Sequence, residues 1–209
     1  MKTLIKQLIP PAFVRYRYPV IGNKIALTFD DGPKPGTTEH ILDILNDFKM
    51  TATFFVLGEM AESNPDLCRR MVDQGHEIGN HGYSHKKCSE LSLKQIEEEI
   101  NLTDRIVENI TQTTPQHFRP PNGALSFPLM WLLTVNRRQP PILWSQMIKN
   151  EWRKEKDELI QEFEQMKLLP GDIVLLHDVN TQTANALPDI LNIIKQRQLV
   201  GSTLSGINI

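Results

Sequence analysis

Strand-like and helix-like segments alternate along most of this 209-residue chain, and that alternation limits the folds open to it. Short runs such as KIALTF (24–29) and TATFFVL (51–57) are apolar and rich in β-branched or aromatic residues, which is typical of buried strands. We predict strands over 24–29, 51–57, 76–81, 116–121, 141–144 and 172–178, and helices over 37–48, 65–73, 92–110, 128–135, 152–167 and 182–197. The helix over 92–110 has the clearest start, because Ser92 suits the N-cap and Gln95 completes a capping box. This order of elements predicts a mostly parallel sheet with helices outside it.

The composition of the chain argues against several classes of protein. The formal net charge is −2 and no block of Lys or Arg stands out, which argues against nucleic acid as a partner. The two cysteines, Cys68 and Cys88, are too few for a cysteine zinc site or a disulfide scaffold. Polar residues and prolines interrupt the apolar N-terminus, and no run approaches the ~20 apolar residues of a membrane span. We therefore expect a cytoplasmic protein without an integral membrane segment; an export leader outside this sequence stays an open alternative.

Polar residues follow several of the predicted strands at their carboxyl ends, which is the face where a β/α barrel gathers its chemistry. Asp30 and Asp31 stand at the end of the first strand, directly before a Gly-Pro turn. In mid-strand, two adjacent aspartates would point to opposite faces, and one charge would be buried on the wrong side. At the strand end both carboxylates can reach one cavity. The alternative is that they only cap a turn.

His81 and His85 are four residues apart, so one helical turn or a tight loop brings both imidazoles to one side. With one carboxylate they make a three-ligand set for a divalent metal, which leaves positions for water and substrate. Glu77 is a rival carboxylate, further back on the predicted strand. Two His and one Asp suit zinc, cobalt, nickel or manganese. The alternative is an ordinary pair of surface histidines.

Arg119 and His177 also follow predicted strands. The rigid guanidinium fork of Arg119 could hold a carboxylate such as Asp30, or it could be a plain salt-bridge partner. His177 ends an apolar strand, where it is either a satisfied core histidine or a general acid that works near neutral pH.

Four motifs occur in an order that resembles the polysaccharide deacetylase family, also called the NodB-homology or carbohydrate esterase 4 (CE4) family. They are T-F-D-D-G-P (28–33), H-G-Y-S-H (81–85), R-P-P-N-G (119–123) and L-L-H-D (175–178). The resemblance spans residues 24 to about 198. It implies an α/β fold, a distorted or incomplete (β/α) barrel with about seven parallel strands and outer helices. Because the sequence has no repeat, low-complexity tract or linker-like stretch, we predict one domain over 1–209, with residues 1–23 as an N-terminal extension.

The resemblance assigns roles to individual residues. Asp30 resembles the general base, His177 the general acid and Arg119 the residue that orients the base. One divalent metal ion, most often zinc, is implied at Asp31, His81 and His85. The expected substrate-binding residues are Asn122 through its backbone N–H, Leu175 at the pocket for the acetyl methyl group, and Trp144.

The chain departs from the family pattern at three places. The Ser or Thr that commonly follows the first metal histidine is Gly82, and the Tyr of the arginine motif is Asn122. The family has one more motif, the fourth in its order, which lies between the arginine motif and L-L-H-D. In this sequence it should fall in LWSQMIKNEW (143–152). Its aspartates are replaced by Gln146 and Asn150, or displaced to Glu151. In the family, the aspartate of this motif supports the catalytic acid or the arginine. The displaced Glu151 and the neighbouring Asp178 are therefore the candidates to support His177.

The leading hypothesis is a metal-dependent hydrolase that removes N-linked acetyl groups from amino sugars of a polysaccharide or glycan precursor. Such an enzyme is a hydrolase of non-peptide carbon–nitrogen bonds, and its partner is an N-acetylated glycan or amino sugar. One alternative is a deformylase or cyclic-amide hydrolase that acts on a small or lipid-linked intracellular substrate. Another is a catalytically weak glycan-binding protein. The sequence makes no prediction of oligomeric state.

Overall fold

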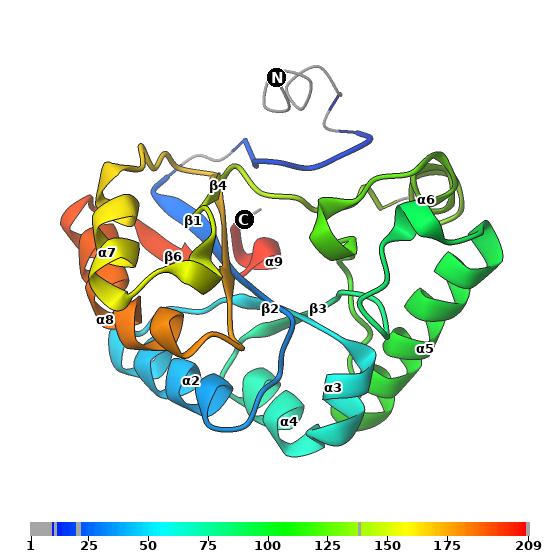
Figure 1. Cartoon of the computed structure of the whole chain (residues 1–209), viewed down its shortest axis with the longest axis horizontal. Coiled ribbons are helices and arrows are strands. Elements are labelled where there is room, and N and C mark those ends of the chain that lie inside the picture. Colours follow the sequence, from blue (N-terminus) through cyan, green and yellow to red (C-terminus); the bar gives the residue numbers. More distant parts are fainter. Residues whose placement is uncertain (1–9, 11, 20–21, 138, 208–209) are drawn as a thin grey trace.

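A sheet of parallel strands forms the centre of the molecule in the computed structural model, which describes residues 10, 12–19, 22–137 and 139–207 (Figure 1). Of the predicted N-terminal extension, residues 1–9, 11, 20 and 21 lie outside the described part. The strands are β1 (Lys24–Asp30), β2 (Thr53–Val56), β3 (Glu77–Asn80), β4 (Gln146–Met147), β5 (Ile173–His177) and β6 (Val200–Ser202). They run in the order β3-β2-β1-β5-β4, with β6 beside the first half of β1, and every pair is parallel.

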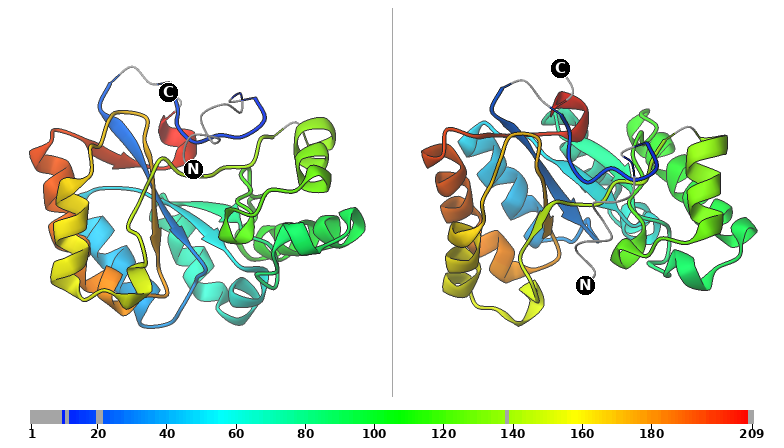
Figure 2. Two further views of the ribbon diagram at one scale, coloured as in Figure 1. Left: turned by 45° about the horizontal axis from the view of Figure 1, so that its top comes forward. Right: turned by 90° about the horizontal axis from the view of Figure 1, so that it is seen from above.

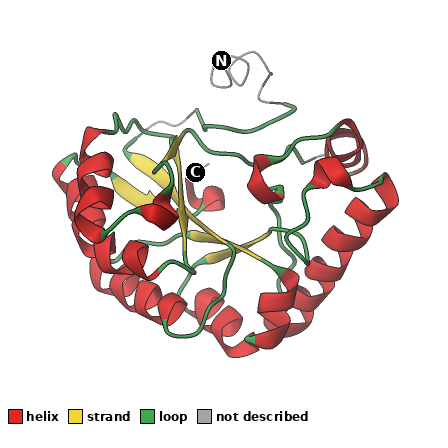
Figure 3. Ribbon diagram, viewed as in Figure 1, coloured by secondary structure: helices red, strands yellow, loops and turns green. Residues whose placement is uncertain are grey.

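Helices surround this sheet, as the views of Figures 2 and 3 show. They are α2 (Thr37–Phe48), α3 (Gly58–Ser63), α4 (Pro65–Asp73), α5 (Leu93–Thr111), α6 (Phe127–Trp131), α7 (Lys156–Gln165), α8 (Thr181–Gln196) and α9 (Leu204–Ile207). The Ser92 side chain accepts a hydrogen bond from the backbone N–H of Gln95 and caps α5, so the predicted capping box is confirmed. In the part of the chain that the structure describes, no helix is both long and apolar enough to cross a membrane.

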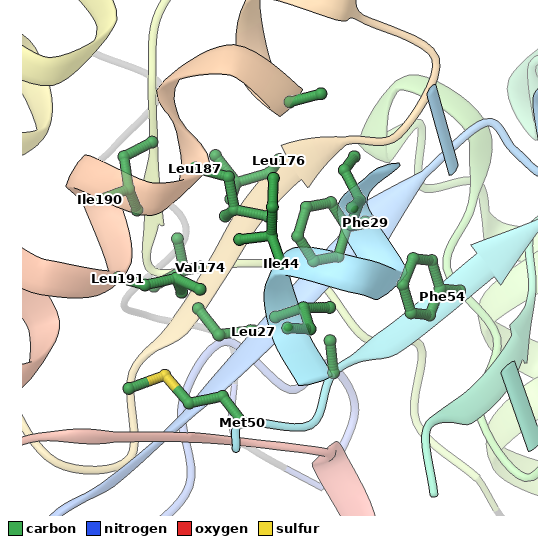
Figure 4. Packing of buried hydrophobic residues seen from close by; sticks show 14 of the residues in the cluster. Leu27, Phe29, Ile44, Met50, Phe54, Val174, Leu176, Leu187, Ile190 and Leu191 are labelled. Atoms are coloured by element: carbon green, nitrogen blue, oxygen red, sulfur yellow. The ribbon is translucent and has the colours of Figure 1, made fainter. Parts of the chain in front are cut away.

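Side-chain alternation along the strands separates two apolar clusters. Leu27, Phe29 and Val174 face outward and pack against helical residues such as Ile44 and Leu187 (Figure 4). The alternate strand positions face inward, and they form a smaller cluster that includes Ala26, Phe55, Ile173, Tyr18 and Ile142. Because successive residues of a strand point to opposite faces, Thr28 and Asp30 share the inner face with Ala26.

The predicted fold class is confirmed: a parallel sheet with outer helices, which the hydrogen bonds of the ladder do not close into a full barrel. Two of the predicted strands, 116–121 and 141–144, are wrong as strands. They form only isolated bridges, from Phe118 to Asn80 and from Ile142 to Arg15. Both segments lie among prolines, which have no N–H to donate to a ladder. The sheet therefore has six strands among the described residues instead of about seven.

Two predicted helices are interrupted. The segment 128–135 is split between α6 and a π-helical turn, Leu132–Asn136. The segment 152–167 begins with a 3-10 turn, Glu151–Arg153, and continues as α7 only from Lys156. This second interruption places Glu151 beside the end of β5, and Glu151 becomes part of the candidate site.

Candidate active site and metal centre

The carboxyl ends of β1 and β5 bring the candidate base and the candidate acid next to each other. Asp30 is the last residue of β1 and His177 the last residue of β5, and the two are directly paired in the parallel ladder. Parallel register thus aligns two residues that are 147 positions apart in the sequence. Both belong to the inward-facing set of their strands.

Asp30 is held by a fully buried arginine. The Arg119 guanidinium donates to Oδ1 of Asp30 at 2.6 Å and to the Thr28 hydroxyl at 2.9 Å. It lies over the ring of Phe55, 4.1 Å from the ring centroid, and also donates to the Leu143 carbonyl at 3.2 Å. Arg119 is 0% exposed and Asp30 is 3% exposed, so each charge depends on the other for compensation. The predicted contact of Arg119 with Asp30 is present.

Asp31 turns out of the strand with a left-handed backbone, at a φ of 77°. This turn breaks the alternation of β1, so the second carboxylate also faces the candidate site. The Oδ1 atom of Asp31 lies 3.4 Å from Nε2 of His81 and 3.2 Å from Nε2 of His85. One ligand atom from each of the three residues falls within 4.8 Å of the others. The cluster predicted from the sequence is therefore assembled.

These three side chains fit a divalent cation. Oδ1 of Asp31 is buried and accepts no hydrogen bond among the described residues, although two imidazole nitrogens are near it. The Nδ1 atom of His81 is 2.7 Å from the Arg119 carbonyl oxygen, which orients the ring and leaves Nε2 toward Asp31. Burial alone would raise the pKa of Asp31, but the attraction of His81 and His85 holds that pKa well below its usual range. A carboxylate that stays ionised and has a free buried oxygen is ready to bind a metal ion.

His177 is supported by Glu151. The Nδ1 atom of His177 lies 2.8 Å from Oε2 of Glu151, which is 2% exposed. The hydroxyl of Thr183 donates to the other carboxylate oxygen, and the His177 backbone N–H donates to the same oxygen at 3.3 Å. Burial lowers the pKa of His177, but the hydrogen bond and charge of Glu151 outweigh it, so the pKa is raised. The exposed Trp152 packs on the imidazole, with ring centroids 4.7 Å apart.

Asp178 does not support His177. It follows His177 in the chain and therefore points to the outer face of the sheet, where the Thr38 hydroxyl donates to it at 2.7 Å. Burial raises the pKa of Asp178 to about 7. Of the candidates for the fourth motif, Glu151 makes the contact with His177. Gln146 instead donates to the Lys167 carbonyl, and Asn150 is exposed.

Glu77, the rival metal ligand, lies at the amino end of β3, away from the strand ends that carry His81 and Asp31. Its carboxylate accepts hydrogen bonds from the hydroxyls of Thr53 and Ser205. Glu77 therefore makes its contacts at the opposite end of the sheet and is not part of the candidate metal cluster.

The three expected substrate-binding residues lie in different surroundings. Leu175 is buried on β5, two residues before His177 and therefore on the same face. Asn122 is exposed in a short turn after Arg119, with a φ of 57°. Trp144 is half-buried, with its ring 5.8 Å from the Arg119 guanidinium carbon, and packs against the inner apolar cluster.

Sequence reasoning missed Glu99 of α5. Its carboxylate holds the turn that carries the two candidate histidine ligands. The one signal for it is its position on the buried stripe of the helix, three residues after Ile96 and four before Thr103.

Comparison with known proteins agrees with this geometry. A family model described as polysaccharide deacetylase matches residues 17–133. The chain is 36% identical over 167 residues to peptidoglycan-N-acetylmuramic acid deacetylase PdaC of Bacillus subtilis, covering 80% of this chain and 35% of that protein. It is 34% identical over 198 residues to a peptidoglycan-N-acetylglucosamine deacetylase of Bacillus cereus, covering 93% of this chain and 92% of that protein. The chain thus spans about a third of the first relative and nearly all of the second.

Solved structures give the same fold. The structure of peptidoglycan deacetylase PdaC from Bacillus subtilis aligns with a TM-score of 0.81 at 32% identity, over 90% of both chains. A CE4 family pseudoenzyme from Bacillus anthracis aligns with a TM-score of 0.86 at 26% identity, over 96% of this chain and 70% of that one. The same fold is therefore found both in a deacetylase and in a pseudoenzyme.

Proposed function

We propose that this chain, which belongs to the polysaccharide deacetylase family, is a metal-dependent hydrolase that removes acetyl groups from N-acetylated amino sugars of a glycan. One observation carries the proposal. At the carboxyl ends of the strands, a three-ligand cluster stands beside an arginine-held carboxylate and a glutamate-held histidine. Amide hydrolysis needs a base for the attacking water and an acid for the leaving amine, and this site has a candidate for each.

Asp31, His81 and His85 would hold one divalent cation, with zinc first and cobalt, nickel or manganese as alternatives. When bound, the ion polarises the amide carbonyl and lowers the pKa of water at the site. The Arg119 carbonyl engages Nδ1 of His81, and the His81 backbone N–H donates to the Val56 carbonyl at 2.9 Å, so the protein supplies the orientation of that ligand.

Asp30 acts as the general base in this proposal. Its Oδ1 accepts from Arg119, and its Oδ2 lies 3.7 Å from Nε2 of His81, on the side of the metal cluster. The arginine therefore keeps one oxygen engaged and leaves the other to take a proton from the attacking water. Because Arg119 is fully buried, it also keeps Asp30 in one orientation.

His177 acts as the general acid. Glu151 engages its Nδ1, so its Nε2 is the nitrogen that can pass a proton to the leaving amine. The raised pKa keeps the imidazole protonated to higher pH, which is the state that an acid needs. Without such a proton the sugar amine is a poor leaving group.

The substrate contacts are part of the same proposal. Leu175 would line the pocket for the acetyl methyl group, because it lies on the inward face of β5 just before His177. The backbone N–H of Asn122 would stabilise the oxyanion, and Trp144 would border the pocket. The sugar itself is proposed only as a class, an N-acetylated hexosamine in a glycan.

Product analysis tests the proposed function. Protein stripped with a chelator and reloaded with zinc, cobalt, nickel or manganese is incubated with N-acetylglucosamine oligomers, peptidoglycan fragments and the N-formylated counterparts of these sugars. Free acetate and formate are then measured. We expect acetate, and we expect Asp30→Asn to lower its release by orders of magnitude. Formate from N-formylated sugars without acetate from acetylated ones would support a deformylase instead, and release of neither by any metal-loaded form would contradict the proposal.

A further inference from the structure

One carboxylate on helix α5 holds the turn that carries the two candidate histidine ligands. Oε2 of Glu99 accepts the backbone N–H groups of Tyr83 and Ser84, each at 2.8 Å. Oε1 of Glu99 accepts the Ser84 hydroxyl at 2.6 Å. All three donors lie in the two residues directly before His85.

The backbone N–H and carbonyl groups of this turn have few other hydrogen-bond partners among the described residues. The carbonyls of Gly82 and Tyr83 accept from the first two residues of α3, at 2.9 and 3.2 Å. The Gly82 N–H donates to the Asn80 side chain at 2.8 Å. The N–H groups of Tyr83 and Ser84, in contrast, donate to Glu99 alone among the residues that the structure describes. His85 then adopts a left-handed backbone, with a φ of 58°, which directs its imidazole back to Asp31.

We propose that Glu99 is a positioning residue that sets the metal affinity of the site by fixing the Gly82–His85 turn. His85 is the most exposed of the three candidate ligands, with a side chain that is 37% exposed against 2% for His81. It is therefore the ligand with least packing to hold it. A neighbour that orients a ligand typically changes metal affinity by about 10–100-fold. The inference rests on the proposed metal site and adds a residue that does not touch the ion.

Two properties of Glu99, its reach and its charge, can be separated by substitution. Glu99→Gln keeps the length and the acceptor oxygen, and its amide can donate to the Ser84 hydroxyl, but the charge is lost. Glu99→Asp keeps the charge and withdraws the carboxylate by one methylene. If positioning is the role, the aspartate variant loses metal affinity and the glutamine variant keeps it.

The experiment titrates zinc into metal-free protein against a chromophoric chelator and compares dissociation constants. We expect Glu99→Asp and Glu99→Ala to bind zinc about tenfold or more weakly than the wild type, and Glu99→Gln to stay within about threefold. Glu98→Ala is the matched control, because Glu98 is the adjacent residue, is 63% exposed and forms an ion pair with Lys94, a surface partner on the same helix. We expect it to bind zinc like the wild type. Should Glu99→Ala fail to fold by circular dichroism, the aspartate and glutamine variants decide.

Two results overturn the inference while the proposed function stands. One is wild-type zinc affinity in Glu99→Asp. The other is a loss of affinity in Glu99→Gln as large as that in Glu99→Ala, which would indicate that the charge of Glu99 matters and not its reach. If wild-type protein itself binds no zinc, the proposed metal site fails and the inference fails with it. The wild-type titration therefore separates the two failures.

Discussion

His177 and Asp178 are adjacent in sequence and are held on opposite sides of strand β5. His177 faces inward to Glu151, and Asp178 faces outward to the Thr38 hydroxyl. Their separation follows from the strand itself, because successive residues of a strand point to opposite faces. The sequence offered both Glu151 and Asp178 as supports for the acid, and only the fold distinguishes them.

Replacing Glu151 tests that support. We expect Glu151→Gln to lower kcat about 10²-fold or more with little change in KM, because the proposed proton donor, His177, would act in the transition state. The carboxylate raises the pKa of His177 against the effect of burial, so its loss lowers that pKa. The acid must be protonated, and the alkaline limb of the kcat profile should therefore move to lower pH.

The control for this experiment is Glu164→Gln, an exposed position on α7, the helix that follows the turn carrying Glu151. We expect its kcat and pH profile to match the wild type. An unchanged alkaline limb in Glu151→Gln would mean that the pair of His177 and Glu151 does not supply the proton.

We expect Asp178 to affect the stability of the folded protein and not the pH dependence of turnover. Its pKa is raised by burial to about 7, from 3.8 for an exposed carboxyl. A group with a raised folded-state pKa contributes stability below its unfolded pKa and loses it as pH rises through the folded value. In metal-free protein, Asp178→Asn should therefore be more stable than the wild type by roughly 2–4 kcal/mol at pH 8, and about equal to it near pH 4.

Urea unfolding of both proteins across that pH range measures the difference. A difference that does not grow between pH 4 and 8 would show that Asp178 is ionised in the folded protein as it is in the unfolded chain. Turnover gives a second readout, since Asp178→Asn should keep the alkaline limb that Glu151→Gln shifts.

At the scale of the elements, the carboxyl ends of three strands assemble the site. β1 supplies Asp30, β5 supplies His177, and Asp31 and His81 directly follow β1 and β3. The sequence predicted β1 and β5 because each is a short apolar run that ends in polar residues, whereas the segment that contains β3, 76–81, indicates only a short strand or strand end. The helix over 92–110 was predicted to within one residue at each end, because its cap and its apolar stripe agree.

The elements that the sequence mispredicted are those that tertiary contacts define. The segments around Phe118 and Ile142 have strand-like composition, yet the prolines near them leave only isolated bridges. β4 and β6 have two and three residues, too short for a period of two to be recognised in the sequence. Arg119 still reaches Asp30, because a single bridge at Phe118 is enough to place the next residue.

Close packing behind the site makes the inner face of β3 sensitive to volume. A Cβ atom on Gly79 would lie 2.6 Å from the ring of Phe55, and that ring lies against the Arg119 guanidinium. We expect Gly79→Ala to lower the free energy of unfolding by about 1–3 kcal/mol through overpacking. We also expect it to lower kcat, because Phe55 must move toward the arginine that holds Asp30.

Gly201→Ala is the matched control on β6. Its added Cβ would lie 2.3 Å from Leu27 on the outer face, away from Arg119. It should cost similar stability, measured by urea unfolding, while the folded variant keeps its kcat. Equal loss of kcat in both variants would argue against the coupling of Phe55 to the site.

At the scale of the whole molecule, the incomplete barrel is the reason that distant residues converge. Its parallel register brings Asp30 and His177 into one pair, and the same end of the sheet holds Asp31, His81 and His85. The sequence predicted this convergence from residue types at strand ends. It could not predict Glu99 or the choice of Glu151, because both depend on how helices pack beside the sheet.

The most direct test of the account is acetate release from an acetylated glycan, measured as metal is added stepwise to stripped protein. The account predicts no release without metal, a rise that ends at one equivalent per chain, and neither binding nor release in Asp31→Ala. Acetate release that is independent of added metal, or that Asp31→Ala retains, would contradict it.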